Sequence, residues 1–214
     1  AELHQEVSRL AQALRNSGVR AGDRVAAYLP NIPGAVIAML AASSIGAIWS
    51  SCSPDFGVQG VLDRFSQIEP KILFVADGYR YAGREYDVRE RVADIVRGLP
   101  SVRKVVVVPY LRPKPDISDI PKAVLLEDWL RKHTPGDIDF VKLPFEHPAY
   151  ILFSSGTTGT PKGAVHVHEA VLAHLCTGRY ALDLHPDDRF WCTADPGWVT
   201  GTSYGILAPL LLGV

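Results

Sequence analysis

The stretch RVAAYLPNIPGAVIAMLAASSIGAIWSS, residues 24–51, decides the fold class. Its first apolar run, 24–30, is typical of a buried strand. Apolar residues then recur at helical spacing over 36–45, with Asn31 placed to cap the helix and Gly46 placed to end it. A short apolar run at the end predicts a second strand. This order predicts two parallel strands joined by a crossover helix.

The same alternation continues on both sides of this unit. We expect a helix over 3–14 that Gly18 ends, a helix over 58–65 that Pro70 closes, a strand over 72–76, a helix over 87–98 and a strand over 104–108. The predicted class is α/β, with parallel, mostly doubly wound sheets and helices on both faces.

Proline divides the chain. The residues Pro109, Pro113, Pro115 and Pro121 indicate an extended surface connection. A short helix is predicted near 124–132, then strands over 149–153 and 163–168, a helix over 169–182 and a strand over 189–194. We therefore expect a first α/β part over 1–108, a proline-rich connection over 109–148, and a third part over 149–214.

Composition limits the partners. The chain has 214 residues, 47% of them hydrophobic, and a net charge of -1, which argues against nucleic acid and membranes as partners and favours small molecules. Its apolar runs are much shorter than the roughly 20 residues of a membrane span. Three cysteines without CxxC spacing argue against disulfides and a zinc site, so we expect a cytoplasmic protein. The oligomeric state stays open.

A loop rich in glycine and hydroxyl groups follows the strand over 149–153. Its sequence is SSGTTGTPKG, residues 154–163. Glycine lets phosphate approach backbone N–H groups closely, hydroxyl groups add donors, and Lys162 supplies a mobile positive charge. The pattern differs from the common G-x-x-x-x-G-K-[ST] loop, because Pro161 stands where the second glycine would be and Gly163 follows the lysine. The sequence predicts a site for polyphosphate or for departing pyrophosphate.

This loop resembles the signature loop of the adenylate-forming superfamily, which includes acyl-CoA synthetases. The resemblance implies an incomplete large N-terminal adenylation domain that binds ATP with magnesium, forms an acyl-adenylate and transfers the acyl group to coenzyme A. It also implies that the loop binds the β- and γ-phosphates, with Lys162 as the catalytic cation. The implied phosphate-binding residues are Ser154, Ser155, Gly156, Thr157, Thr158, Gly159, Thr160, Pro161, Lys162 and Gly163.

Two longer resemblances point to different acids. The segments 22–31, 38–74 and 143–159 are similar to acetoacetyl-CoA synthetases, a likeness that extends over about 1–165. By contrast, WCTADPGWVTGTSYG at 191–205 is similar to acetyl-CoA synthetases. That likeness implies an acyl pocket with the wall residues Trp198, Val199, Thr200 and Thr202. Acetoacetate is therefore the expected acid, with acetate or propionate as the alternative. Pro196 and Thr202 depart from the acetyl-CoA synthetase pattern, which has valine and histidine there.

Both ends of the chain fall inside predicted structure, so we expect part of a longer enzyme, without its small C-terminal domain and with little ligase activity alone. One alternative is a non-catalytic nucleotide-binding or structural fragment. Another is a peptide-synthetase adenylation domain, against which the match to free-standing ligases argues. The histidines His166, His168 and His174 lack a third ligand at a standard metal spacing, so we expect structural roles for them.

Overall fold

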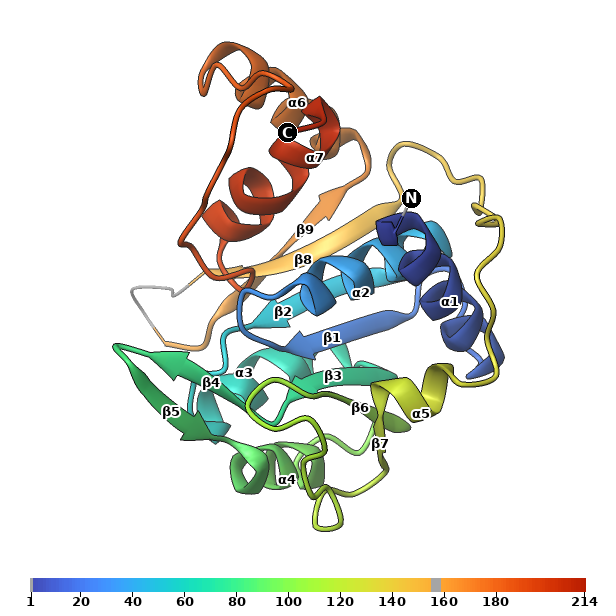
Figure 1. Ribbon diagram of the computed structural model, residues 1–214, viewed down its shortest axis with the longest axis vertical. Coiled ribbons are helices and arrows are strands. Elements are labelled where there is room, and N and C mark those ends of the chain that lie inside the picture. Colours follow the sequence, from blue (N-terminus) through green and yellow to red (C-terminus); the bar gives the residue numbers. More distant parts are fainter. Residues whose placement is uncertain (1, 155–158) are drawn as a thin grey trace.

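The computed structural model describes residues 2–154 and 159–214, and within them a seven-stranded sheet forms the centre of the molecule (Figure 1). The strand order is β7-β6-β3-β1-β2-β8-β9. Neighbours from β7 to β8 are parallel, and only β9 runs antiparallel, against β8. The bounds are β1 (Arg24–Tyr28), β2 (Ile48–Cys52), β3 (Ile72–Ala76), β6 (Lys104–Val108), β7 (Ala123–Leu125), β8 (Pro148–Ser154) and β9 (Lys162–Val167). The predicted α/β class is confirmed.

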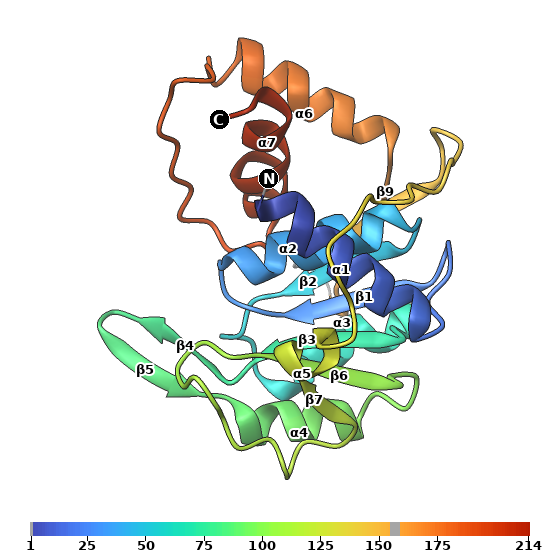
Figure 2. The same cartoon turned by 45° about the vertical axis from the view of Figure 1, so that its right-hand side comes forward.

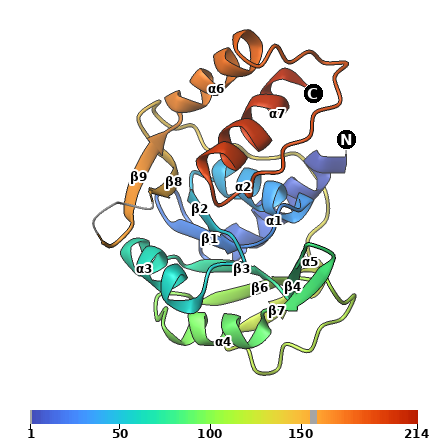
Figure 3. The ribbon, with the colours of Figure 1, turned by 90° about the vertical axis from the view of Figure 1, so that its left-hand side faces the viewer.

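Helices cover both faces of the sheet, as Figure 3 shows end-on. One face carries α1 (Glu2–Asn16), α2 (Pro33–Ser44) and α5 (Leu126–Leu130), and the other carries α3 (Val58–Ile68) and α4 (Arg89–Arg97). Successive side chains of a strand point to opposite faces. Val25 and Ala27 of β1 accordingly pack under α1 and α2, whereas Ala26 and Tyr28 pack under α3 and α4. Burial on both faces explains the continuous apolar runs of the central strands.

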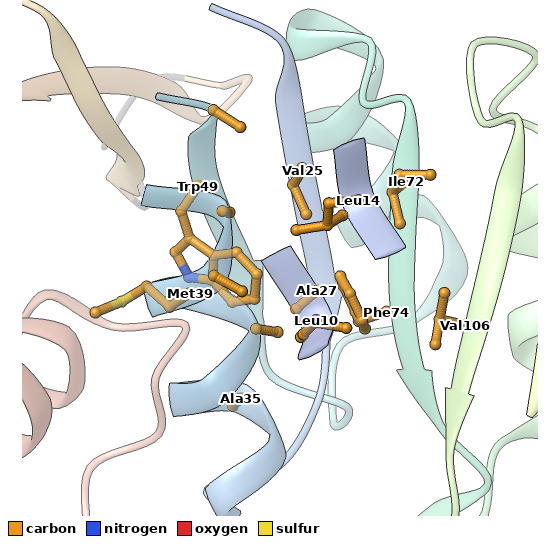
Figure 4. Close-up of a cluster of buried hydrophobic side chains, with 14 of the residues drawn as sticks. Leu10, Leu14, Val25, Ala27, Ala35, Met39, Trp49, Ile72, Phe74 and Val106 are labelled. Atoms are coloured by element: carbon orange, nitrogen blue, oxygen red, sulfur yellow. The ribbon is translucent and has the colours of Figure 1, made fainter. Parts of the chain in front are cut away.

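The core under α1 and α2 is shown in Figure 4. The Trp49 indole lies beside Met39, and its ring centroid is 6.5 Å from that of Phe74 on β3. Full burial of an aliphatic or Phe side chain stabilises a fold by about 1.5–3 kcal/mol. This cluster fixes β1, β2 and β3 relative to one another, and with them the edge at which these parallel strands end.

Two predictions for the chain around Asn31 are wrong, and one contact explains both. Asn31 does not cap α2, which begins at Pro33 with Ile32 as its N-cap residue. Its side-chain amide instead donates to the carbonyls of Cys192 (3.1 Å) and Ala194 (3.4 Å). The segment 189–194 is not a strand, because within the described sheet no strand pairs with it. The asparagine satisfies two of its carbonyls in place of a strand.

A two-stranded hairpin, β4 (Gly78–Tyr81) and β5 (Arg84–Asp87), was not predicted. Its turn residues Ala82 and Gly83 have φ angles of 49° and 74°, the pattern of a tight hairpin turn. The hairpin takes up the start of the helix expected over 87–98, so α4 begins at Arg89. Similarly, only the centre of the helix expected near 124–132 is helical, because β7 precedes α5.

The last part of the chain forms a small helical layer, visible beyond α2 in Figure 2. It contains α6 (Glu169–Tyr180), a π-helical segment η1 (Gly201–Leu207) and α7 (Ala208–Leu212). The helix predicted over 169–182 is thus confirmed. Ile206 and Leu207 bury their side chains in the core under α1 and α2, which joins this layer to the sheet. Among the helices of the described residues, none has the length and apolar character needed to cross a lipid bilayer.

Candidate functional site

A pocket lies at the carboxyl edge of β1 and β2, the edge that faces the viewer in Figure 3. The chain leaves β1 toward α2 on one face and leaves β2 toward α3 on the opposite face. Adjacent strands that diverge in this way leave a crevice, which is where open α/β sheets bind ligands. The pocket has a volume of about 720 Å³. It is lined by Pro30, Asn31, Ser53, Pro54, Asp55, Tyr79, Arg80, Tyr81, Tyr86, Thr193, Ala194, Asp195 and Trp198.

The predicted phosphate loop connects β8 to β9. Ser154 is the last residue of β8 and pairs with Lys162, the first residue of β9. Paired residues of an antiparallel ladder have their side chains on the same face of the sheet, and the Ser154 hydroxyl donates to the Lys162 carbonyl (3.5 Å). Lys162 is exposed to solvent. The sequence placed this lysine in a loop, whereas the structure anchors its backbone in the sheet.

Further contacts support the second half of the loop. The Pro161 carbonyl accepts a hydrogen bond from the Gln67 side chain of α3 (2.9 Å). A Cβ on Gly163 would lie 3.2 Å from the Ile151 and Phe153 side chains, so glycine allows β9 to pack closely there. Gly159 has a φ of 129° and, like Thr160, is exposed. The predicted phosphate-binding residues Ser155, Gly156, Thr157 and Thr158 lie outside the described residues.

The predicted acyl-pocket segment begins with a tight turn over 195–198. The Asp195 carboxylate accepts a hydrogen bond from the Gly197 amide (2.8 Å), and the Trp198 amide donates to the Asp195 carbonyl (3.0 Å). The Pro196 carbonyl accepts hydrogen bonds from the Ser51 and Thr202 hydroxyls. These bonds fix the 195–198 turn to β2 on one side and to η1 on the other.

The four predicted wall residues do not share one environment. The side chains of Trp198, Val199 and Thr200 are exposed, with Trp198 at 44%. The Trp198 indole lies 5.8 Å from the Phe56 ring, centroid to centroid. Thr202 is buried, and its hydroxyl donates to the Pro196 carbonyl (2.7 Å). The structure therefore shows Thr202 supporting the turn, and its contact with a substrate stays a prediction.

Strand β2 connects strand β8 on one side with the 195–198 turn on the other. The Ser50 hydroxyl donates to the Ile151 carbonyl of β8, and the Ser51 hydroxyl donates to the Pro196 carbonyl of the turn, both at 2.8 Å. Because β2 and β8 are parallel neighbours, their carboxyl ends lie at the same edge of the sheet. The end of β8 and the turn beside β2 therefore lie at the same edge of the sheet.

Burial shifts the pKa values of one group in the turn, Asp195, and of one group at the end of β2, Cys52. The pKa of Asp195 is raised to about 6, chiefly by burial and further by the nearby Asp55 carboxylate, against the opposing hydrogen bonds from Gly197 and Ser53. Burial also raises the pKa of the Cys52 thiol to about 12. At neutral pH the Asp195 carboxylate is charged and the Cys52 thiol is protonated.

The histidines His166, His168 and His174 each contact another ring. The His166 ring stacks on Tyr150 at a centroid distance of 4.8 Å, and the Tyr150 hydroxyl bonds to the Nε2 atom of His174 (2.8 Å). His168 contacts the His147 ring instead. Over residues 2–154 and 159–214, histidine, cysteine and acidic side chains do not gather in threes that could bind a metal ion.

Sequence reasoning missed several residues that build the site. Asn31 was taken for a helix cap, and Asp195 was not singled out, although an Asp-Pro-Gly triplet is typical of a turn. Arg80 and the tyrosines of the unpredicted hairpin also line the pocket. Their signal was the alternation of Tyr79, Arg80 and Tyr81 before an Ala-Gly turn.

A doubly wound sheet with a crevice at its carboxyl edge defines an α/β fold of the kind that binds ligands at this edge. The chain belongs to the AMP-binding enzyme family, whose model matches residues 1–214. It is 49% identical over 204 residues to acetoacetyl-CoA synthetase of Macaca fascicularis. This match covers 92% of this chain and 30% of that protein. It is 39% identical over 216 residues to acetyl-coenzyme A synthetase of Methanothrix thermoacetophila. This match covers 99% of this chain and 32% of that protein.

A solved structure is also similar. Acetoacetyl-CoA synthetase from Streptomyces lividans superimposes with a TM-score of 0.89 at 42% sequence identity, over 99% of this chain and 32% of that one. The chain thus spans about a third of the length of these relatives.

Proposed function

We propose that the protein containing this chain is an AMP-forming acid:CoA ligase whose acid is acetoacetate. The observation that carries the proposal is the 49% identity to an acetoacetyl-CoA synthetase over 92% of the chain, within the AMP-binding enzyme family. ATP, coenzyme A and a carboxylate are then the small-molecule substrates. The crevice at the ends of β1 and β2 is the place where we expect substrates to enter. A cytoplasmic location is part of the proposal, since the three cysteines are free.

In the first half-reaction a carboxylate oxygen attacks the α-phosphorus of ATP. The bond from that phosphorus to the bridging oxygen breaks, and pyrophosphate leaves with the negative charge. We assign Lys162 to the stabilisation of this charge, because its backbone is fixed in β9, opposite Ser154, while its side chain is exposed to solvent. In the second half-reaction the sulfur of coenzyme A attacks the acyl carbon, AMP leaves, and the thiol proton passes to solvent.

Magnesium would neutralise phosphate charge when bound with ATP. The Ser154 and Thr160 hydroxyls are oxygen donors of the kind that magnesium accepts, and magnesium is usually held through the phosphates of a substrate. These residues fit a complex of magnesium with ATP. The remaining loop residues, Ser155 to Thr158, enter the proposal through the family resemblance alone.

For the acid, we assign Trp198, Val199 and Thr200 to the pocket wall, with Thr202 holding the turn that presents them. A large indole at this wall would limit the length of the acid that the pocket admits. A second candidate acid is acetate or propionate. It is favoured by the similarity of 191–205 to acetyl-CoA synthetases and by the 39% identity to one of them over nearly the whole chain.

The test measures ATP–pyrophosphate exchange by the full-length protein with acetoacetate, acetate, propionate and butyrate. We expect the highest kcat/KM with acetoacetate. Lys162→Ala should lower exchange by roughly 100-fold, as loss of a charge-stabilising group does. Lys132→Ala, which removes an exposed lysine from a different region, should leave exchange unchanged. Highest activity with acetate would favour the second candidate, and no exchange with any acid would support a non-catalytic protein.

A further inference from the structure

The Trp198 indole packs against the Phe56 ring, which belongs to the loop over 53–57. This loop is itself fixed: the Tyr28 hydroxyl lies 2.7 Å from the Pro54 and Phe56 carbonyls, and the Arg91 guanidinium of α4 donates to the Pro54 carbonyl (2.9 Å). Phe56 therefore presents its ring from a rigid segment.

The Phe56 ring has a neighbour on each side. The Arg64 guanidinium lies 4.5 Å from its centroid, and the Trp198 indole lies at 5.8 Å with an interplanar angle of 54°. The Arg64 contact is a cation–π interaction and holds the ring in place. An aromatic pair of the Phe56–Trp198 kind contributes about 0.5–1.5 kcal/mol beyond its buried area. This energy favours one orientation of the Trp198 indole but is too small to fix that orientation alone.

The backbone beside Trp198 has little room to move. A Cβ on Gly197 would lie 2.7 Å from the Ser53 amide nitrogen, and a Cβ on Gly201 would lie 2.0 Å from the Asp195 carbonyl oxygen. The 195–198 turn thus lies directly on the end of β2. Its shape depends on Asp195, whose carboxylate accepts the Gly197 amide and whose carbonyl accepts the Trp198 amide.

We propose that Asp195 is a positioning residue for acid selection: it fixes the 195–198 turn on the end of β2 and so holds the Trp198 indole against Phe56, where the indole limits the length of the acid. This inference rests on the proposed function, which places Trp198 in the acyl pocket. Asp195 acts through Trp198 and does not itself touch the acid. The Asp55 carboxylate, in the loop after β2, adds to the burial that raises the pKa of Asp195, and Asp195 in turn adds to the burial that raises the pKa of the Cys52 thiol.

The test compares Asp195→Ala and Asp195→Asn in the full-length enzyme, with Asp187→Asn as a control at an exposed acid of the preceding loop. We expect Asp195→Ala to lower kcat/KM for acetoacetate by roughly 10- to 100-fold, mostly through KM, while kcat/KM for hexanoate falls less or rises. The KM for ATP should not change. Asparagine keeps an oxygen that accepts the Gly197 amide, so Asp195→Asn should retain the wild-type acid preference.

Phe56→Ala provides a second route to the same result, and it should shift the preference toward hexanoate in the same direction. An equal loss for all acids with unchanged KM in Asp195→Ala would overturn the proposal. So would Asp195→Asn behaving like the alanine variant, or an unaltered preference in Phe56→Ala.

A separate readout keeps this inference distinct from the proposed function. In hydrogen exchange, Asp195→Ala should speed exchange of the Trp198 amide by at least roughly tenfold and leave the amides of β1 unchanged. If the wild type forms no adenylate but this change occurs, the proposed function fails while the role of Asp195 in the turn stands. Unchanged exchange at Trp198 would overturn that role whatever the activity.

Discussion

Replacement of Asp77 by alanine would remove a buried carboxylate that holds three backbone amides. Asp77 is fully buried between β3 and β4. Its Oδ1 atom accepts hydrogen bonds from the amides of Tyr110 (2.7 Å) and Leu111 (3.0 Å), and its Oδ2 atom accepts one from the amide of Arg112 (2.9 Å). It thereby anchors the start of the proline-rich connection to the base of the β4–β5 hairpin.

The size of the effect follows from these contacts. Hydrogen bonds to a charged group contribute about 1.5–3 kcal/mol each, and amides left unpaired in a buried site cost about 1–3 kcal/mol. The three bonds share one carboxylate and are not additive. We expect Asp77→Ala to lower the free energy of unfolding by about 4 kcal/mol. For a protein of this size that lowers Tm by roughly 8–16 °C.

The variant Asp77→Asn provides a graded comparison. Its oxygen can accept the amides of Tyr110 and Leu111, but its amide group would face the Arg112 amide, donor against donor. We expect a loss of about 2 kcal/mol. Asp137→Asn, at an exposed position, should change stability by less than about 0.5 kcal/mol. Urea denaturation followed by circular dichroism measures all three variants. A loss below about 1 kcal/mol in Asp77→Ala would refute the reasoning.

Two further predictions concern stability. Gly46 has a φ of 75°, and a Cβ there would lie 2.9 Å from the Ala21 Cβ, so Gly46→Ala should cost about 2 kcal/mol in urea denaturation. Gly136→Ala, with open space around it, should cost less than about 0.5 kcal/mol, and equal losses would contradict the steric argument. The pKa of Asp195 is raised to about 6 from the usual 3.8, so between these values the folded state binds more protons than the unfolded chain, and stability falls as pH rises. Asp195→Asn should therefore stabilise the protein by about 2 kcal/mol at pH 8 and by much less at pH 4, and a gain independent of pH would contradict the assignment.

Much of the sheet followed from local pattern. Apolar runs such as ILFVA and KVVVV predicted β3 and β6, because a strand buried on both faces carries an almost uninterrupted series of apolar residues. The same reasoning failed at 189–194. That segment has strand-like composition, but strand formation also requires a neighbouring edge, and here the Asn31 side chain binds the carbonyls instead. The β4–β5 hairpin was missed because its outer strand is exposed and polar.

By itself the sequence determined the α/β class, the alternation of β1, β2, β3 and β6 with the helices between them, and the family resemblance of the loop with Lys162. These depend on short-range spacing: residue periodicity, glycine and proline positions, and one ten-residue motif. Only the tertiary structure decided that β1 and β2 diverge to leave a crevice, that Lys162 begins an antiparallel strand, and that Asp195 and Phe56 meet at Trp198. Asp195 and Phe56 are 139 positions apart, and packing against the end of β2, which no local pattern records, brings them together.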